Sequence, residues 1–273
     1  MSDTAGPPAA GAISALVRAI ESEFAANPPT LCLIGLSGVG KSSTINAMFG
    51  TTLAVSATMG STSRFSARTF DIISRRTEAA PVTCKLKVYD APGLGEDETL
   101  DANYLERYRT HLPKCDVALW VVAARNRALA LDQRYLAQLS DKMPNLVIAI
   151  NQVDLVDPLD WNTAINMPSR GQADAIAIIA RDRHEKLSRY MTADCPVIAY
   201  SAQRFYNLQA LFTTCLKAAP KNRRWMFELL KSFSTRDWLA QAKGLSPTQR
   251  AALAEKYIAS DSAITLDQLA GRV

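Results

Sequence analysis

The stretch Leu31-Cys-Leu-Ile-Gly35-Leu-Ser-Gly-Val-Gly40-Lys41-Ser42 decides the fold. Its four apolar residues, 31–34, predict a short buried strand, and residues 43–49 predict a helix that ends before Gly50. Between them, residues 35–42 fit the pattern G-x-x-x-x-G-K-[ST] at every fixed position. Glycines let backbone N–H groups surround a phosphate closely, and the start of the following helix adds partial positive charge. The stretch therefore predicts a phosphate-binding loop of a nucleotide site.

Each part of this loop has an expected role. Lys41 is expected to reach the β- and γ-phosphates, and the hydroxyl of Ser42 is expected to ligate Mg²⁺. A chance Gly-rich turn before a helix is the alternative, which the preceding strand and the following helix disfavour. The residues predicted to line the phosphates are Gly35, Ser37, Gly38, Val39, Gly40, Lys41, Ser42 and Ser43.

The composition is that of an ordinary globular protein. The chain has 273 residues, of which 48% are hydrophobic and 21% charged, so one large domain with small additions is expected. No apolar run approaches the roughly 20 residues that span a bilayer, and the N-terminus lacks the pattern of a secretory signal. The five cysteines are scattered without metal-ligand spacing, which favours a reduced, cytoplasmic location.

A modest basic bias is concentrated near the end of the predicted domain. The formal net charge is +5, and Lys217, Lys221, Arg223, Arg224 and Lys231 lie close together. A solvated helix face is the favoured interpretation. Contact with RNA or with an anionic membrane surface is the alternative.

The order of the predicted elements indicates an α/β fold. Apolar positions in 12–26 recur with helical spacing, so residues 1–29 are expected to form a disordered start and an amphipathic helix. Strands and helices then alternate, which predicts a mostly parallel, doubly wound sheet in a three-layer domain over residues 30–219. The predicted strands are 67–74, 82–89, 116–123, 145–150 and 196–200, and the predicted helices are 97–111, 128–142, 172–190 and 208–218.

Residues 220–273 are expected to form a small C-terminal helical region. No strand pattern follows Pro220, and the capping box Ser246-Pro-Thr-Gln249 predicts a helix to about Ile258. An apolar stripe of Trp225, Phe227, Leu230 and Phe233 has two interpretations. It either docks on the α/β domain, which is favoured, or binds a partner in response to nucleotide.

Two further stretches at strand ends suit the phosphates and the metal. In Asp90-Ala-Pro-Gly93, the carboxylate is expected to hold Mg²⁺ through water, and the Gly93 N–H is expected to contact the γ-phosphate. A plain Pro-Gly turn is the alternative. The polar stretch 51–66 is the expected first switch, where Thr62 is the chosen ligand of Mg²⁺ and the γ-phosphate, while Thr58 and Ser63 remain open.

Two other stretches suit a guanine base. A carboxylate at Asp154, in Asn151-Gln152-Val-Asp154, accepts both N1–H and the N2 amino group, a donor pair that adenine lacks. Asn151 is expected to meet the O6/N7 edge and the phosphate loop. Gln152 stands where Lys is usual, which is expected to weaken affinity more than selectivity. A backbone amide of Ser201-Ala202-Gln203 is expected to bind O6.

Taken together, these motifs resemble the Era-like (TrmE/Era/septin-like) branch of the P-loop GTPases. They look most like poorly characterised bacterial GTPases that are catalogued as ribosome-associated or prophage-borne. The resemblance covers about residues 30–219 and implies GTP and GDP as ligands, Mg²⁺ as cofactor and a Ras-like six-stranded sheet in which strand 67–74 runs antiparallel. The catalytic residues would be Lys41, Thr62 and Gly93.

The chain departs from the family where hydrolysis is concerned. Ras-type enzymes place Gln directly after Asp-x-x-Gly, where this chain has Leu94, and Gly38 stands where potassium-dependent relatives have Asn. We therefore expect slow intrinsic hydrolysis that is assisted by a partner or by a homodimer formed through the nucleotide face. Arg64 and the acidic residues 96–98 are weaker candidates for this assistance.

Three functions remain open at this point. A molecular switch that hydrolyses GTP is the leading hypothesis, with the ribosome, RNA or an anionic membrane as its partner. The alternatives are a nucleotide-stabilised scaffold with negligible turnover and an ATP-using P-loop enzyme, against which Asp154 argues.

Overall fold

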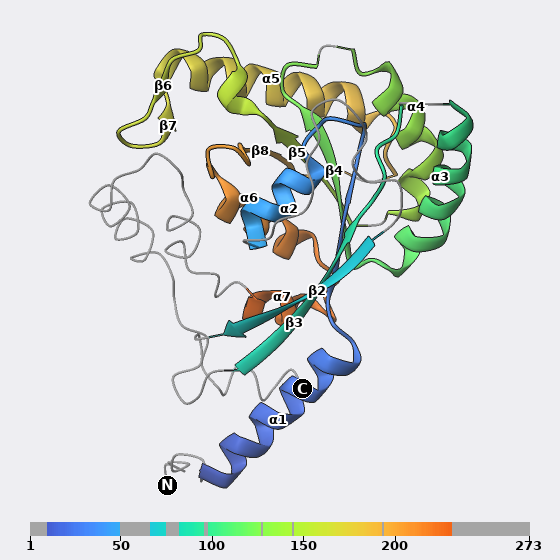
Figure 1. Ribbon diagram of the computed structural model, residues 1–273, viewed down its shortest axis with the longest axis vertical. Helices are drawn as coiled ribbons and strands as arrows, with labels where there is room; N and C mark the ends of the chain where they lie inside the picture. The colour runs from blue at the N-terminus through green and yellow to red at the C-terminus, as the bar shows by residue number, and fades with distance from the viewer. Residues whose placement is uncertain are drawn as a thin grey trace, which may run out of the picture.

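The computed structural model describes residues 10–49, 66–74, 82–95, 98–126, 128–143, 145–192 and 194–230. Its centre is a six-stranded sheet with the order β2-β3-β1-β4-β5-β8 (Figure 1). All neighbouring pairs are parallel except β2 with β3, as the family resemblance implied. The strands are β1 (Thr30–Ile34), β2 (Ser66–Ser74), β3 (Val82–Asp90), β4 (Val117–Ala123), β5 (Leu146–Asn151) and β8 (Val197–Ala199).

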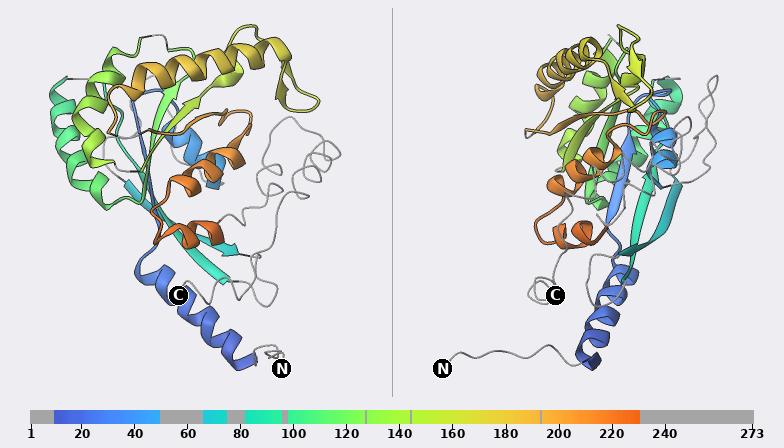
Figure 2. Two further views of the ribbon diagram at one scale, coloured as in Figure 1. Left: turned by 180° about the vertical axis from the view of Figure 1, so that it is seen from behind. Right: turned by 90° about the vertical axis from the view of Figure 1, so that its left-hand side faces the viewer.

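Helices cover both faces of this sheet (Figure 2). On one face α3 contacts α4 and α4 contacts α5, while α2 and α6 lie on the other (Figures 1 and 2). The three-layer α/β fold is thereby confirmed. The helices are α2 (Lys41–Phe49), α3 (Glu98–His111), α4 (Ala130–Leu139), α5 (Arg170–Ser188) and α6 (Leu208–Ala218).

Strands β4 and β5 lie inside the sheet and form much of its core. Every residue of β5 is buried, and β4 is buried up to its last residue, because parallel strands covered by helices have no solvent face. Trp120 of β4 is fully buried, and its Nε1 donates to Asp132 Oδ1 of α4 at 2.9 Å. Burial raises the pKa of Asp132 to about 6, although the Trp120 bond and the charge of Arg183 oppose this shift.

The predicted N-terminal helix is α1 (Ala10–Ala26), and it docks on β3. Ile20 and Phe24 are fully buried, and Glu21 Oε1 accepts a hydrogen bond from Thr83 N at 2.9 Å. The helix extends beyond the ends of β2 and β3 (Figure 1). The predicted disordered start, residues 1–9, lies outside the described residues.

The described part of the C-terminal region packs on the α/β domain. Helix α7 (Arg224–Leu230) contacts α6, β2 and β3, and four of its residues are buried: Met226, Phe227, Leu229 and Leu230. Trp225 meets Phe24 of α1 edge to face, with ring centroids 5.9 Å apart. The docking interpretation is therefore correct for Phe227 and Leu230. Phe233 and the predicted helix 246–258 lie outside the described residues.

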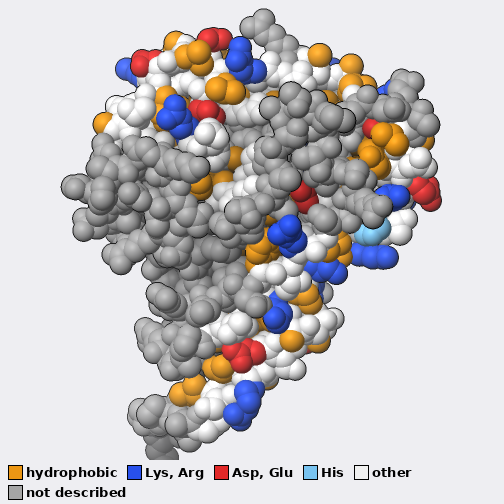
Figure 3. Space-filling view, in the orientation of Figure 1, with side chains coloured by type: hydrophobic (Ala, Val, Ile, Leu, Met, Phe, Trp, Pro, Cys, Tyr) orange, Lys and Arg blue, Asp and Glu red, His pale blue; other side chains and the backbone are white. Residues whose placement is uncertain are grey.

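Two of the clustered basic residues anchor this tail. Arg223 Nε lies 2.8 Å from Asp116 Oδ1, and Arg223 Nη2 donates to Asn27 O at 2.9 Å. Arg224 Nη2 donates to Lys217 O at 2.8 Å. On the face in Figure 3, Lys and Arg side chains lie in several separate places rather than in one continuous patch. The side chains of these two arginines therefore make bonds within the chain itself.

The sequence-based boundaries differ from the observed ones by at most three residues, and one hairpin was missed. The predicted loop 151–171 contains a hairpin of β6 (Trp161–Asn162) and β7 (Met167–Pro168). Strands of two residues are too short to produce a recognisable alternation of apolar and polar residues. The predicted helix 128–142 ends as an α-helix at Leu139, and Ser140–Lys142 form a 3₁₀ turn.

All five cysteines are free. Burial raises the pKa of the Cys84 and Cys215 thiols to about 12, which keeps these two groups protonated and unreactive. Among the described helices, none is long and apolar enough to cross a membrane.

Candidate nucleotide-binding site

The phosphate loop joins β1 to α2 and depends on two close backbone approaches. Gly35 has a φ of +142°, and a Cβ there would lie 2.3 Å from Val121 O. Gly40 has a φ of +91°, and a Cβ there would lie 2.4 Å from Asn151 Nδ2. These contacts, together with the left-handed backbone, require glycine at both positions.

The predicted phosphate and metal ligands lie at the start of α2. Lys41 is buried, and its Nζ donates to the carbonyl oxygens of Leu36 at 2.9 Å and Gly35 at 3.2 Å, so its charge is held within the loop. Ser42 Oγ donates to Asp90 Oδ2 at 2.8 Å. A hydroxyl and a carboxylate oxygen this close together fit a small hard cation such as Mg²⁺.

The stretch Asp90–Gly95 follows β3 and lies directly against the phosphate loop. A Cβ on Gly93 would lie 2.7 Å from Ser37 Cα, so only glycine fits there. Ser37 N donates to Leu94 O at 2.9 Å, and Leu94 N donates to Gly35 O at 3.3 Å. The side chain of Leu94 is fully buried. The predicted γ-phosphate contact therefore lies against the predicted phosphate loop.

Sequence reasoning missed three residues that hold this stretch. Gly95 N donates to both carboxylate oxygens of Asp101 at 3.0 Å, and Tyr135 OH donates to the same carboxylate. Tyr108 OH donates to Pro92 O at 2.5 Å, and burial raises the pKa of Tyr108 well above its usual value, so the hydroxyl stays a donor. They come from α3 and α4 and form no local motif, so nothing in the sequence around them points to this role.

Asn151 links the phosphate loop to the loop after β8. Its side chain is buried, Nδ2 donates to Val39 O at 3.0 Å, and Oδ1 accepts from Ala202 N at 3.1 Å. The next residue, Gln152, has a φ of +64°, and its Nε2 donates to Gly38 O at 3.2 Å. Gln152, which replaces the usual Lys, therefore still contacts the phosphate loop.

The carboxylate of Asp154 is suited to a ligand with paired donors. Its Oδ1 is buried and has no hydrogen-bond partner among the described residues. Guanine offers the N1–H and N2 amino donors that such an acceptor needs. Ser201 is buried and exchanges two backbone hydrogen bonds with Tyr206, at 3.0 and 3.1 Å, which closes the loop that carries Ala202 and Gln203.

The predicted site residues thus meet at the carboxyl ends of β1, β3, β5 and β8, where ligands bind in parallel α/β sheets. Ser43 follows Ser42 in α2, and Val39 is buried in the loop. The other predictions lie outside the part of the chain that the structure describes: Thr58, Thr62, Ser63, Arg64, Glu96, Asp97 and the side chain of Glu98. The arrangement defines a P-loop nucleotide-binding domain.

Known proteins share this domain. Residues 30–152 match the model of the family described as 50S ribosome-binding GTPase. The uncharacterized protein YfjP of Escherichia coli (strain K12) is 24% identical over 195 residues, which are 71% of this chain and 63% of YfjP. The tRNA modification GTPase MnmE of Laribacter hongkongensis is 27% identical over 233 residues, covering 76% of this chain and 48% of MnmE.

A solved structure has the same fold. Era in complex with MgGDPNP and nucleotides 1506–1542 of 16S ribosomal RNA superposes with a TM-score of 0.52 at 22% identity, over 71% of this chain and 57% of that one. The chain therefore spans less than two thirds of the length of these relatives. The resemblance predicted from the motifs is confirmed: the α/β domain is similar in sequence to this GTPase family model and to MnmE, and it has the fold of Era.

Proposed function

We propose that this chain binds GTP and GDP and hydrolyses GTP to GDP and phosphate with Mg²⁺. The observation that carries the proposal is the double contact of Asn151, which joins the phosphate loop at Val39 O to the loop of Ala202. This contact connects the Lys41 end of the site to the Asp154 end, so that one molecule with a triphosphate and a guanine would reach both. The family match of residues 30–152 supports the same function.

Each end of the site would contribute separately. Lys41 would neutralise phosphate charge, the Gly93 N–H would contact the γ-phosphate, and Ser42 and Asp90 would hold Mg²⁺, with Thr62 as the proposed further ligand. Bound Mg²⁺ would offset negative charge on the β- and γ-phosphates. Asp154 would accept the guanine donors, Asn151 and Gln152 would hold the base against the phosphate loop, and the segment Ser201–Gln203 would approach O6.

The intrinsic rate is proposed to be slow. Leu94 takes the place of a water-orienting Gln, and its aliphatic, fully buried side chain offers no donor or acceptor to water. A partner, or a second copy bound at the nucleotide face, would supply what is missing. The protein would then act as a cytoplasmic molecular switch whose GTP and GDP forms differ in the first switch and in Asp90–Gly95.

Ribosomal RNA is the proposed partner. The solved Era complex contains nucleotides of 16S ribosomal RNA, and the matching family is described as ribosome-binding. Co-sedimentation with ribosomes in GTP, GDP and nucleotide-free buffers would test this partner separately from nucleotide binding.

The guanine assignment is tested by competition against a fluorescent GDP. GTP and GDP should displace the probe while ATP does not. Asp154→Asn should lower GDP affinity by about 10- to 100-fold and raise the relative affinity for xanthosine diphosphate, since the amide presents a donor where the carboxylate presents an acceptor. Equal competition by ATP would leave a P-loop protein of another reaction, and tight GTP binding without single-turnover hydrolysis would indicate a scaffold.

A further inference from the structure

The segment between the two guanine loops, residues 156–172, contains the hairpin β6–β7 and the first turn of α5. We propose that this segment, through Trp161, Asn166 and Gln172, is a brace that positions both loops and thereby sets guanine affinity and selectivity. The inference rests on the proposed function. The three residues are positioning residues, since each acts through backbone or side chains of the loops.

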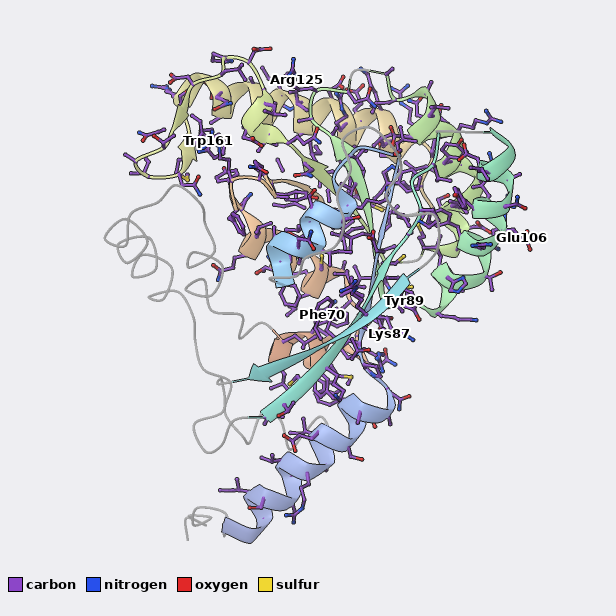
Figure 4. The ribbon with its side chains drawn as sticks, viewed as in Figure 1. Phe70, Lys87, Tyr89, Glu106, Arg125 and Trp161 are labelled. Atoms are coloured by element: carbon purple, nitrogen blue, oxygen red, sulfur yellow. The ribbon has the colours of Figure 1, made fainter. Side chains whose placement is uncertain are left out.

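The hairpin holds the loop after β8 from outside. Asn166 Nδ2 donates to Arg204 O at 2.7 Å, and Trp161 Nε1 donates to Asn166 Oδ1 at 3.1 Å. The Trp161 ring meets Tyr206 edge to face, with centroids 5.2 Å apart. Figure 4 labels Trp161 on the hairpin, next to that loop. Because Tyr206 is paired with Ser201, the hairpin fixes the two ends of the turn that carries Ala202 and Gln203.

The first turn of α5 holds the other loop. Gln172 is fully buried, and its Nε2 donates to Val156 O at 2.8 Å and to Asp154 O at 3.3 Å. Ser169 caps the helix by accepting from Gln172 N at 3.2 Å, which fixes the residue that makes these bonds. The backbone of Asp154 is therefore held by a side chain that lies 18 residues further along the chain.

These loops need external support because their backbones are strained. Gln152, Phe205 and Asn207 all have positive φ values, of 64°, 54° and 62°, which non-glycine residues adopt at a cost. Asn151 links these loops to the phosphate loop, and the brace bonds them at other backbone positions, Asp154 O and Arg204 O. A base contact depends on placement to a few tenths of an ångström, so loss of the brace should weaken the base contacts while the phosphate contacts remain.

Inosine diphosphate distinguishes the effect of Gln172 from that of the hairpin residues Trp161 and Asn166, because it keeps O6 and N1–H but lacks the N2 amino group. Gln172 positions Asp154, the proposed acceptor for both N1–H and N2. Gln172→Met should therefore lower GDP affinity about 10-fold, because two bonds are disturbed, and inosine diphosphate affinity only about 3-fold, because one bond is disturbed. Asn166 positions the loop that approaches O6, which both nucleotides share. Asn166→Ala should therefore raise the dissociation rates of both by a similar factor, about 5-fold, and leave their ratio unchanged.

The measurement is the equilibrium affinity and dissociation rate of fluorescent GDP and inosine diphosphate, together with the melting temperature without nucleotide. Ile165→Ala is the matched control, since Ile165 precedes Asn166 in the same hairpin and is 54% exposed. Methionine keeps the volume of Gln172 and also removes its Oε1, which is buried and has no hydrogen-bond partner among the described residues, so the fold should tolerate it. Trp161→Phe, which keeps a ring but loses the bond to Asn166, should give a smaller version of the Asn166 effect.

The outcomes separate the two proposals. If wild-type protein does not prefer GDP to ADP, the proposed function fails. If wild-type protein prefers GDP, and Gln172→Met, Asn166→Ala and Trp161→Phe all keep the wild-type affinities and the wild-type ratio of GDP to inosine diphosphate affinity, the brace alone is overturned. The brace is also overturned if Gln172→Met weakens both nucleotides equally in proportion to a fall in melting temperature.

Discussion

The two ends of the nucleotide site are built in different ways. At the phosphate end, backbone groups hold one another: Ser37 N bonds Leu94 O, Leu94 N bonds Gly35 O, and Gly93 lies against Ser37. At the guanine end, side chains hold the loops: Asn151 and Asn166 bond backbone groups of the loop after β8, and Gln172 bonds the backbone of Asp154.

This difference has a physical reason. A phosphate is bound by many N–H groups at once, which requires a glycine-rich backbone that packs closely on itself, although side chains of α3 and α4 support the outer stretch Asp90–Gly95. A base is recognised by a few directed hydrogen bonds, so the loops that make them must be placed from several directions. We therefore expect variants at the phosphate end to affect all nucleotides, and variants at the guanine end to affect discrimination between bases.

The largest effect is expected where the two ends meet. Gly40→Ala would place a Cβ 2.4 Å from Asn151 Nδ2 in a left-handed backbone conformation. Affinity for GDP and for inosine diphosphate should both fall by at least about 100-fold, with about 1–3 kcal/mol lost in stability. Fluorescent nucleotide titration and urea unfolding measure the two effects.

Gly38→Ala is the matched control for that clash. Its φ is +75°, but a Cβ there would meet no atom within 4 Å. It should therefore retain the cost of strain without the displacement of Asn151, and it should weaken binding much less. Equal losses for the two variants would show that the Asn151 junction is not what connects the two ends.

A smaller effect, on the pH dependence of stability, is expected at Asp132, which belongs to neither end of the nucleotide site. Burial raises its pKa to about 6, so the folded state holds a proton that the unfolded state releases near pH 4. Its stabilising contribution is full below about pH 4 and is lost as the pH rises through 6. Asp132→Asn, which stays neutral, should therefore match the wild-type free energy of unfolding near pH 4 and exceed it by about 3 kcal/mol at pH 7–8.

Urea unfolding at several pH values checks this prediction, and GDP affinity at pH 7.5 should not change between the two proteins. A stability difference that is constant with pH would mean that the Asp132 carboxylate is compensated by Arg183 throughout this range. A change in GDP affinity would connect this buried cluster to the nucleotide site.

The smallest effect on activity is expected at Leu94. Leu94→Gln restores the residue that Ras-type enzymes use, but the side chain at this position is fully buried and cannot reach the attacking water. Single-turnover hydrolysis should stay within about threefold of wild type, while the buried amide costs about 1–2 kcal/mol of stability. Leu159→Gln, at a residue that is 66% exposed, controls for the chemical change. An acceleration of tenfold or more would show that a side chain at position 94 can reach the attacking water after all.

Most of the fold and the phosphate end were predictable from the sequence. Residues 31–42 contain the strand, the glycines and the Lys-Ser pair next to one another, and Asp90–Gly93 follows the predicted strand 82–89. The loops proposed to bind guanine could also be located from the sequence, because Asn151, Asp154 and Ser201 stand at strand ends with short spacing. In each case the chemistry depends on residues that are adjacent in the chain.

The hairpin and the supports of both ends were not predictable. Trp161 and Asn166 act on a loop about 40 residues away, and Asp101, Tyr108 and Tyr135 act on Asp90–Gly95 from two helices. A Tyr or Gln in an amphipathic helix has the same local pattern whether its polar group meets water or a distant carbonyl. Only the packed structure shows whether the polar group meets water or a distant carbonyl.

The sequence alone therefore determined the class of the domain, the succession of strands and helices along the chain, and the positions of the predicted phosphate and guanine motifs, because each is carried by a short run of adjacent residues. Tertiary structure alone decided that Asn151 also accepts from Ala202 N, that Leu94 is buried, and that Gln172 and the hairpin hold the loops proposed to bind guanine. These contacts join residues that are far apart in the sequence, and no local sequence pattern shows which side chains the folded sheet brings together.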